Sequence, residues 1–234
     1  MCQPASLGPS AGGRSVSVPV ARAPCCSLNL SVSRGSSSLD KGPRQRDTCH
    51  YVGMGTYVAF LRAVNVRPRW VRMADLTELL ESSGYTDVDT HIQSGNVRLT
   101  TPMRSRGKLA AALHEQISLK FGFDVPVVLR TLDDLAELSR QIDDLGVPDL
   151  GEPLRSTYVT LLSEEPPPEW TAELQAWSVP GEAATVLGEN VVAWYSRTMQ
   201  NSKLPANSIW KRLPAVQTAR NITVIRAILE RWGE

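Results

Sequence analysis

The sequence predicts an α+β protein made of two ferredoxin-like (βαββαβ) units packed together, preceded by a disordered N-terminal extension. Three observations support this prediction. The order strand, helix, strand, strand, helix, strand runs over residues 57–130. The same order of elements returns after a segment rich in glycine and proline. Residues 1–53 are rich in Ser, Gly, Pro and Arg and show no sustained hydrophobic period.

The extension, residues 1–53, cannot bury enough apolar surface to offset its ordering entropy, so we expect it to be disordered. Sequence typical of a folded protein begins directly after Met54, which leads to the hypothesis that translation starts at Met54. This segment holds all four cysteines, which are Cys2, Cys25, Cys26 and Cys49. We therefore expect neither a disulfide framework nor a cysteine metal site in the folded part.

The first predicted unit, together with one extra helix, covers residues 54–145. Its first strand, over 56–66, is apolar on both faces apart from Arg62, which is typical of a central strand covered on both sides. The remaining elements are helices over 72–83 and 106–121, hairpin strands over 87–93 and 97–101, a strand over 125–130 and a helix that Thr131 caps. In such a unit the first and third strands are central neighbours, which would bring Arg62 and Arg98 close together.

The second predicted unit covers residues 157–234 and follows a linker over 146–156. Its elements are a strand over 157–162, a helix led by three prolines at 166–168, hairpin strands over 183–187 and 191–195, a short helix over 205–213, a strand over 216–219 and a final helix that Asn221 caps. We find no residue-level repeat between the units, only a repeated order of elements. A single, larger mixed sheet is the alternative architecture.

Charge and hydropathy exclude several classes of protein. The chain has 234 residues, 42% of them hydrophobic, and a formal net charge of +1. Beyond Gly53 it carries 19 basic and 22 acidic residues, so a broad basic face of the kind found in dedicated DNA-binding proteins is not expected. No run approaches a membrane span and no signal peptide is evident, so we expect a soluble, cytoplasmic protein without a membrane partner.

The tetrapeptide Gln93-Ser94-Gly95-Asn96 interrupts an alternating, extended run. A hairpin turn explains it, because Gly and Asn tolerate positive φ, and ligand binding explains it as well. A nucleophilic Ser94 is less favoured, since the flanking residues lack the G-x-S-x-G elbow. His91 lies on the same strand face as Gln93, either as a structural histidine or as a general base.

Three basic positions indicate anion binding. A buried Arg62 requires an anionic or multiply accepting partner, which is either a carboxylate of the fold or a bound anion. Ser202-Lys203 precedes the predicted short helix and Arg220-Asn221 begins the last one, where free N–H groups and the helix dipole attract anions. Ordinary helix capping is the alternative for both pairs.

Three stretches of the chain resemble the family called domain of unknown function 1697. Residues 59–66 resemble its leucine-arginine-glycine-isoleucine-asparagine-valine motif, and residues 91–97 its tyrosine-isoleucine-glutamine-serine-glycine-asparagine-valine motif. Residues 202–204 and 218–221 resemble its serine-lysine-leucine and threonine-x-arginine-asparagine motifs. The chain departs from the family at Ala63, where glycine is usual, and at Ile222, where the usual tryptophan is missing. The resemblance, over about residues 56–232, implies an α+β bacterial protein of unassigned activity.

The favoured hypothesis is a protein that binds an anionic or phosphate-bearing ligand, either a nucleotide or a nucleic acid. The predicted ligand-binding residues are Arg62, Asn65, Gln93, Ser94, Gly95, Asn96, Ser202, Lys203, Arg220 and Asn221. The hypothesis requires these residues to converge on one cleft. The alternatives are a hydrolase or transferase that uses His91 or Ser94, and a structural or interaction protein without a small-molecule site. We expect no cofactor and no metal, and the sequence leaves the oligomeric state open.

Overall fold

The computed structural model describes residues 53–233 of the chain. The sequence-based expectations for residues 1–52 therefore lie outside the described residues. Within residues 53–233, no helix combines the length and apolar character that crossing a bilayer requires.

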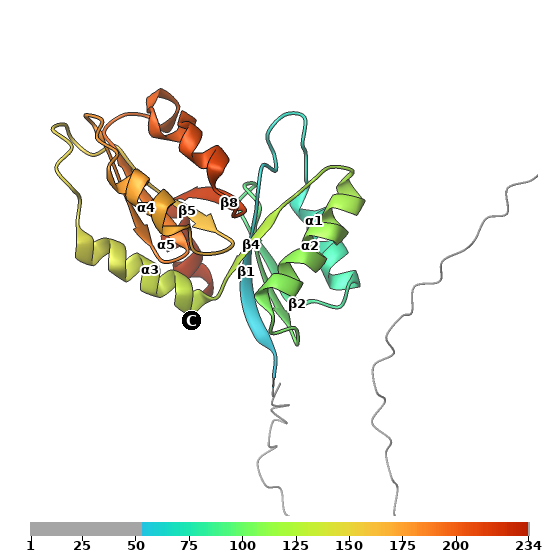
Figure 1. The fold of residues 1–234 in the computed structure, drawn as a ribbon. Coiled ribbons are helices and arrows are strands. Elements are labelled where there is room, and N and C mark those ends of the chain that lie inside the picture. Colours follow the sequence, from blue (N-terminus) through green and yellow to red (C-terminus); the bar gives the residue numbers. More distant parts are fainter. Residues whose placement is uncertain (1–52, 234) are drawn as a thin grey trace, which may run out of the picture. The chain divides into compact units, whose positions relative to one another are not determined.

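The first half of the described chain contains a four-stranded antiparallel sheet with the strand order β2-β3-β1-β4 (Figure 1). Its elements are β1 (Gly55–Leu61), α1 (Met73–Ser82), β2 (Thr86–His91), β3 (Asn96–Thr101), α2 (Arg106–Phe121) and β4 (Val127–Arg130). The first and third strands are central neighbours, as predicted, and Phe60 lies opposite Asn96 in their register. This arrangement is compatible with a ferredoxin-like unit.

The second half contains a separate four-stranded antiparallel sheet with the order β6-β7-β5-β8. Its elements are β5 (Ser156–Leu162), α4 (Pro168–Gln175), β6 (Glu182–Leu187), β7 (Asn190–Tyr195), β8 (Gln217–Asn221) and α5 (Ile222–Trp232). The helix α3 (Leu132–Leu145), predicted as the extra helix of the first unit, packs in a core with side chains of both sheets. The predicted α+β class is thus confirmed. The alternative of one larger mixed sheet is wrong, because the strands fall into two sheets.

The predicted short helix over residues 205–213 is wrong. Three 3-10 helices, Met199–Asn201, Leu204–Ala206 and Ser208–Arg212, occupy the region between β7 and β8. Asn207 has an extended backbone between the last two, and its side chain accepts from the N–H of Ile209, so a continuous α-helix cannot form. The face of the second sheet that a second α-helix would cover carries this irregular segment instead.

The predicted first strand is too long, because the chain leaves the sheet after Leu61. Ala63 and Asn65 have φ angles of 54° and 56°, which lie outside the β region and interrupt a regular strand. Arg62 is consequently exposed, so the predicted buried guanidinium is wrong. In the register Arg98 lies opposite Val58, four residues before Arg62, so the expected pairing of the two arginines is not formed.

The hairpin turn begins two residues earlier and ends one residue earlier than predicted. β2 ends at His91, the turn consists of residues 92–95, and Asn96 is the first residue of β3. Positive φ angles fall on Ile92 (51°) and Gly95 (75°), and Asn96 is fully buried in the strand. At Gly95 a Cβ atom would come within 2.5 Å of the Val64 side chain, so both the backbone and the available space require glycine.

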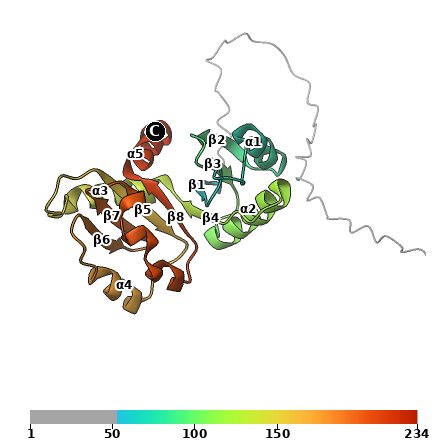
Figure 2. The ribbon, with the colours of Figure 1, turned by 90° about the horizontal axis from the view of Figure 1, so that it is seen from above.

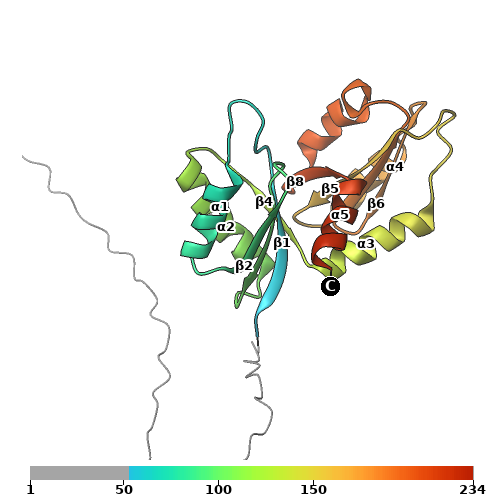
Figure 3. The same ribbon diagram turned by 180° about the vertical axis from the view of Figure 1, so that it is seen from behind.

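Alternating side chains on each central strand divide the interior into three hydrophobic cores. On β1, Ala59 and Leu61 face α1 and α2, whereas Val58 and Phe60 enter a second core with α3 and α5. Val159 of β5 enters that second core from the other sheet. Figures 2 and 3 show α5 on the side of the first sheet opposite α1 and α2. Separating the halves would expose these side chains, at about 1.5–3 kcal/mol for each large one.

Candidate functional site

Arg220 of β8 reaches the hairpin turn of the first sheet. Its Nε donates to Asn96 Oδ1 at 2.6 Å, and its second terminal nitrogen donates to the carbonyls of Leu61, Ser94 and Gly95 at 2.9, 2.9 and 3.3 Å. Its first terminal nitrogen donates to Thr218 Oγ1 and to the Ala219 carbonyl. Every N–H of the guanidinium is therefore engaged inside the protein, and no donor is free for a ligand.

Arg130 of β4 makes the corresponding contacts in the opposite direction. It donates to the carbonyls of Leu162 and Glu189, both at 2.8 Å, and to Asn190 Oδ1 at 3.1 Å. Leu162 ends β5 as Leu61 ends β1, and Asn190 begins β7 as Asn96 begins β3. Each half thus sends an arginine into the hairpin turn of the other half. We call these two sets of contacts the arginine clasps.

The two arginine clasps differ in charge. The carboxylate of Glu189 lies 3.4 Å from Arg130, whereas no carboxylate of residues 53–233 forms an ion pair with Arg220. Burial lowers the pKa of Arg220 to about 10, so the side chain still carries its charge at neutral pH. The Phe60 ring, with its centroid 5.6 Å from the guanidinium carbon, lies next to this charge.

Asn65 and Gln93 fix the loop that follows β1. The Asn65 side chain donates to the Gln93 carbonyl and accepts from the N–H of Val71 at 2.9 Å. Asn65 and Gln93 also line a hollow of about 590 Å³ together with Trp70 and Arg72. The amide of Asn65 is therefore occupied, although the hollow beside it is open.

Hydrogen bonds within the protein, near the ends of helices, involve the predicted residues Ser202, Lys203 and Asn221. Ser202 donates from its hydroxyl to the Thr198 carbonyl. The N–H groups of Lys203 and Leu204 donate to the buried carboxylate of Glu182, which fills the position that an anion would take. Asn221 caps α5 by accepting from the N–H of Thr223 at 2.9 Å.

His91 and Ser94 do not form a catalytic pair. The His91 ring packs edge-on against Trp232, with ring centroids 6.2 Å apart, and no residue of the described range hydrogen-bonds to its nitrogens. Ser94 Oγ accepts from Asn96 Nδ2 at 3.0 Å, so its neighbour is a donor and not a base.

Arg62 lines a cavity of about 350 Å³ over the second sheet, where the 3-10 helices replace a second α-helix. Tyr158 of β5 and Tyr195 of β7 line it as an edge-to-face pair with ring centroids 6.1 Å apart, and Trp210 lies on another side. Lys211 adds a second cation. Neither cation forms a hydrogen bond through its side chain, or an ion pair, with residues 53–233, so both remain available to an anion.

Tyr195 adds a neutral hydroxyl to this cavity. The side chain is 3% exposed, and no residue of the described range hydrogen-bonds to its hydroxyl. Burial, with the neighbouring charge of Glu182, raises its pKa, so the hydroxyl keeps its proton and can donate. The cavity thus combines two cations, a phenol donor and aromatic surface.

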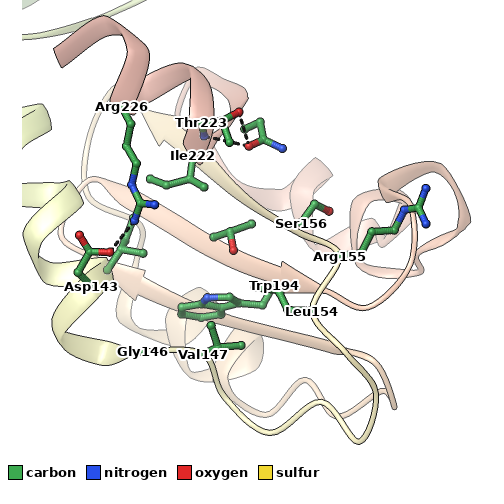
Figure 4. Close-up of a pocket in the computed structure, with 13 residues that line it drawn as sticks. Asp143, Gly146, Val147, Leu154, Arg155, Ser156, Trp194, Ile222, Thr223 and Arg226 are labelled. Atoms are coloured by element: carbon green, nitrogen blue, oxygen red, sulfur yellow. Dashed lines mark hydrogen bonds and ion pairs between the residues drawn. The ribbon is translucent and has the colours of Figure 1, made fainter. Parts of the chain in front are cut away.

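A second cavity, of about 420 Å³, lies at the N-terminal end of α5 (Figure 4). Two arginines line it. Arg226 binds Asp143 at 2.5 Å, whereas Arg155 forms no ion pair with residues 53–233 and extends away from Trp194 in Figure 4. The Asn221 cap occupies an N–H of the helix. The indole of Trp194 forms one wall. Because Arg226 is already neutralised and Arg155 is directed away from the Trp194 wall, this cavity suits an anion less well than the cavity that Arg62 lines.

The structure does not bring the ten predicted residues into one cleft. Ser94, Gly95, Asn96 and Arg220 meet in one arginine clasp, whereas Arg62 lines the cavity over β5 and β7. Sequence reasoning missed the aromatic and basic residues of that cavity, which are Tyr158, Tyr195, Trp210 and Lys211. The alternation in residues 157–162 could have indicated Tyr158, because it shares a strand face with Thr160.

The chain is an α+β protein with two four-stranded antiparallel sheets, each packed against helices. An arginine from each half joins it to the hairpin of the other half. The family model described as protein of unknown function (DUF1697) matches residues 54–192, and the chain belongs to this family. The resemblance seen in the sequence is thereby confirmed, although the motifs at 202–204 and 218–221 lie beyond the matched residues.

Among solved structures, the chain is similar to the conserved bacterial protein SP0830 from Streptococcus pneumoniae. The TM-score is 0.57 with 20% sequence identity, over 77% of this chain and 99% of that protein. At this identity the likeness concerns the fold alone. No curated protein matches the sequence.

Proposed function

We propose that the protein binds a small anionic ligand with an aromatic group, of the size of a nucleotide, in the cavity over β5 and β7. The proposal rests on two cations, Arg62 and Lys211, that form no ion pair with residues 53–233. They line the cavity together with the rings of Tyr158 and Trp210. Charge-assisted hydrogen bonds to a phosphate and stacking on an aromatic ring are the two interactions such a ligand needs.

The size and polarity of the cavity support the same class of ligand. Its volume of about 350 Å³ falls within the usual range for small-molecule sites, about 300–1,000 Å³. Tyr195 and Gln217 provide polar groups at its wall, so the orientation of a ligand can be fixed. Of the ten residues predicted from the sequence, the proposal uses Arg62. The cytoplasmic location expected from the sequence stays a prediction.

Calorimetric titration with nucleoside monophosphates, inorganic phosphate and neutral nucleosides tests the proposal. The nucleotides should bind, and each nucleoside should bind more weakly than its nucleotide, because it lacks the charge that Arg62 and Lys211 recognise. Arg62→Ala and Lys211→Ala should each weaken nucleotide binding by about 10-fold, the effect of one lost charge-assisted hydrogen bond.

Arg104→Ala and Lys120→Ala are the matched controls. Arg104 lies beside Gly53 and Lys120 lies in the last turn of α2, and neither lines the cavity. Tyr195→Phe keeps the ring and removes the hydroxyl, so it separates hydrogen bonding from packing. Absence of binding by every nucleotide, or equal loss in the control variants, would overturn the proposal.

A further inference from the structure

The loop that follows β1 is strongly basic. We call residues 62–72 the arginine loop, because it contains four arginines, Arg62, Arg67, Arg69 and Arg72, and no acidic residue. Three of the four are exposed, and none forms an ion pair with a described residue. Arg69 donates to the Asp124 carbonyl, while the carboxylate of Asp124 is held by His114 at 2.6 Å. The positive charge of the loop is therefore not neutralised locally.

The arginine loop is ordered by its own contacts. Val64 and Val71 anchor its two ends in the core of the first sheet. The Asn65 side chain joins the loop to the Gln93 carbonyl, and the N–H of Arg69 donates to the Val66 carbonyl at 2.7 Å. Figure 1 shows the loop between β1 and α1, extending beyond the end of β1. A ligand would therefore meet a preformed surface, with little ordering entropy to offset.

The loop also presents an aromatic surface. The side chain of Trp70 is 62% exposed and lines the hollow of about 590 Å³ with Arg72. This hollow shares no lining residue with the cavity over β5 and β7. Arg62, the first residue of the loop, lines that cavity, so the loop connects the two.

We infer that the occupant of the cavity is one nucleotide of a single-stranded nucleic acid, whose neighbouring phosphates and bases lie along the arginine loop. This inference rests on the proposed function. One nucleotide cannot use two separate hollows, whereas a strand can place different bases on Trp210 and Trp70. Stacking platforms combined with arginines that follow the backbone are typical of single-strand binding. Because the folded part carries a mild net negative charge, we expect salt-sensitive contacts with the nucleic acid at the arginine loop and not across a broad basic face.

Fluorescence anisotropy with a fluorescein-labelled single-stranded oligonucleotide of about ten nucleotides tests the inference on the full chain. The oligonucleotide should bind more tightly than a nucleoside monophosphate measured by competition. Trp70→Ala should weaken oligonucleotide binding by about 5-fold or more, the effect of one lost stacked base. Arg67→Ala combined with Arg72→Ala should lower the salt dependence, the slope of log K against log salt, by about 1.4.

The loop variants separate this inference from the proposed function. They should leave binding of the mononucleotide unchanged, whereas Arg62→Ala should weaken both ligands. Arg104→Ala combined with Lys120→Ala controls for the loss of two exposed cations. Equal affinity for the oligonucleotide and the mononucleotide, or for an acidic peptide of the same charge, would overturn the inference and leave the cavity proposal standing. Failure of the mononucleotide itself to bind would overturn the proposed function.

Discussion

Arg220 illustrates how a polar family motif can serve the interior of a protein. Its charge is buried and forms no ion pair with residues 53–233. Four of its hydrogen-bond acceptors are backbone carbonyls, and a fifth is the side-chain oxygen of Asn96. Neutral oxygens stabilise a buried guanidinium when every N–H is satisfied in a fixed geometry. The same contacts give a donor to carbonyls at the end of β1 and in the turn, and the Gly95 carbonyl also accepts from the N–H of Leu61 at 2.8 Å.

At this scale, Arg220→Lys should destabilise the protein although it keeps the charge. An ammonium group has three donors and cannot reach the planar set of acceptors, so buried carbonyls lose partners at about 1–3 kcal/mol each. Urea unfolding should show a loss of at least about 3 kcal/mol. Arg212→Lys is the control, because its exposed ion pair with Glu173 contributes less than about 1 kcal/mol. Equal stability of the two variants would contradict this role of Arg220.

Helix α5 shows how one element ties its own half to the other. The indole N–H of Trp232 donates to the Asp89 carboxylate at 2.9 Å, and Arg231 donates to both of its oxygens. Arg98 of β3 lies with its guanidinium carbon 5.9 Å from the Trp232 ring. The last turn of α5 is thus held by polar contacts to β2 and β3, in addition to the apolar stripe of Ile225 and Ile228 in the second core.

The attachment of α5 should depend on pH through Asp89. Burial acts to raise the pKa of Asp89, but the hydrogen bonds from Trp232 and Arg231 and the charge of Arg231 outweigh it, so the pKa is lowered. A lowered folded-state pKa means that the contribution is complete above the unfolded pKa, about 3.9, and is lost as the pH falls through the folded value.

The variant Asp89→Asn should therefore be less stable than the parent protein at pH 6, and the difference should shrink as the pH falls below about 4. Urea unfolding at a series of pH values measures both quantities. Asp144→Asn, at an exposed ion pair of α3, should stay within about 0.5 kcal/mol of the parent protein. A difference for Asp89→Asn that is independent of pH would show that its carboxylate charge is not involved.

Helices with regular apolar spacing over many residues were predictable from the sequence. Contacts between elements were not. Hydrophobic spacing and the Thr131 and Asn221 caps indicate α3 and α5, because both helices bury one continuous stripe. The segment before β8 was predicted as one short helix, but the extended Asn207 divides it. The partners of Arg220 in the first half could not be predicted, since they are mostly backbone carbonyls, which every residue has, and lie 124 to 159 residues away.

The residue-level repeat was invisible in the sequence for a similar reason. Leu61 and Leu162, Asn96 and Asn190, and Arg130 and Arg220 occupy matching places, but the separations within these pairs differ because the intervening elements differ in length. In the candidate cavity, Tyr158 and Lys211 come from segments that only the fold brings together. Arg62 was singled out because a buried arginine was expected, but the chain leaves the sheet after Leu61 and the side chain is exposed.

At the scale of the whole molecule, the second core and the arginine clasps should make the two halves unfold together. Hydrogen exchange followed by mass spectrometry tests this on peptides from β1 and β5. Because each clasp contacts both sheets, Arg130→Lys and Arg220→Lys should reduce protection in both peptides to a similar extent. Loss of protection in one peptide alone would show that the halves are energetically independent.

The reciprocal direction of the clasps has a consequence for inheritance. Each half carries the side chain that completes the other half's hairpin, so a gene rearrangement that replaced only one half with a divergent copy would remove compatible partners from both turns at once. An insertion or deletion in residues 92–95 or 188–189 would disturb the contacts of the arginine that the opposite half contributes. The two halves must therefore change together over generations, and relatives that retain Arg130 should also retain Asn190.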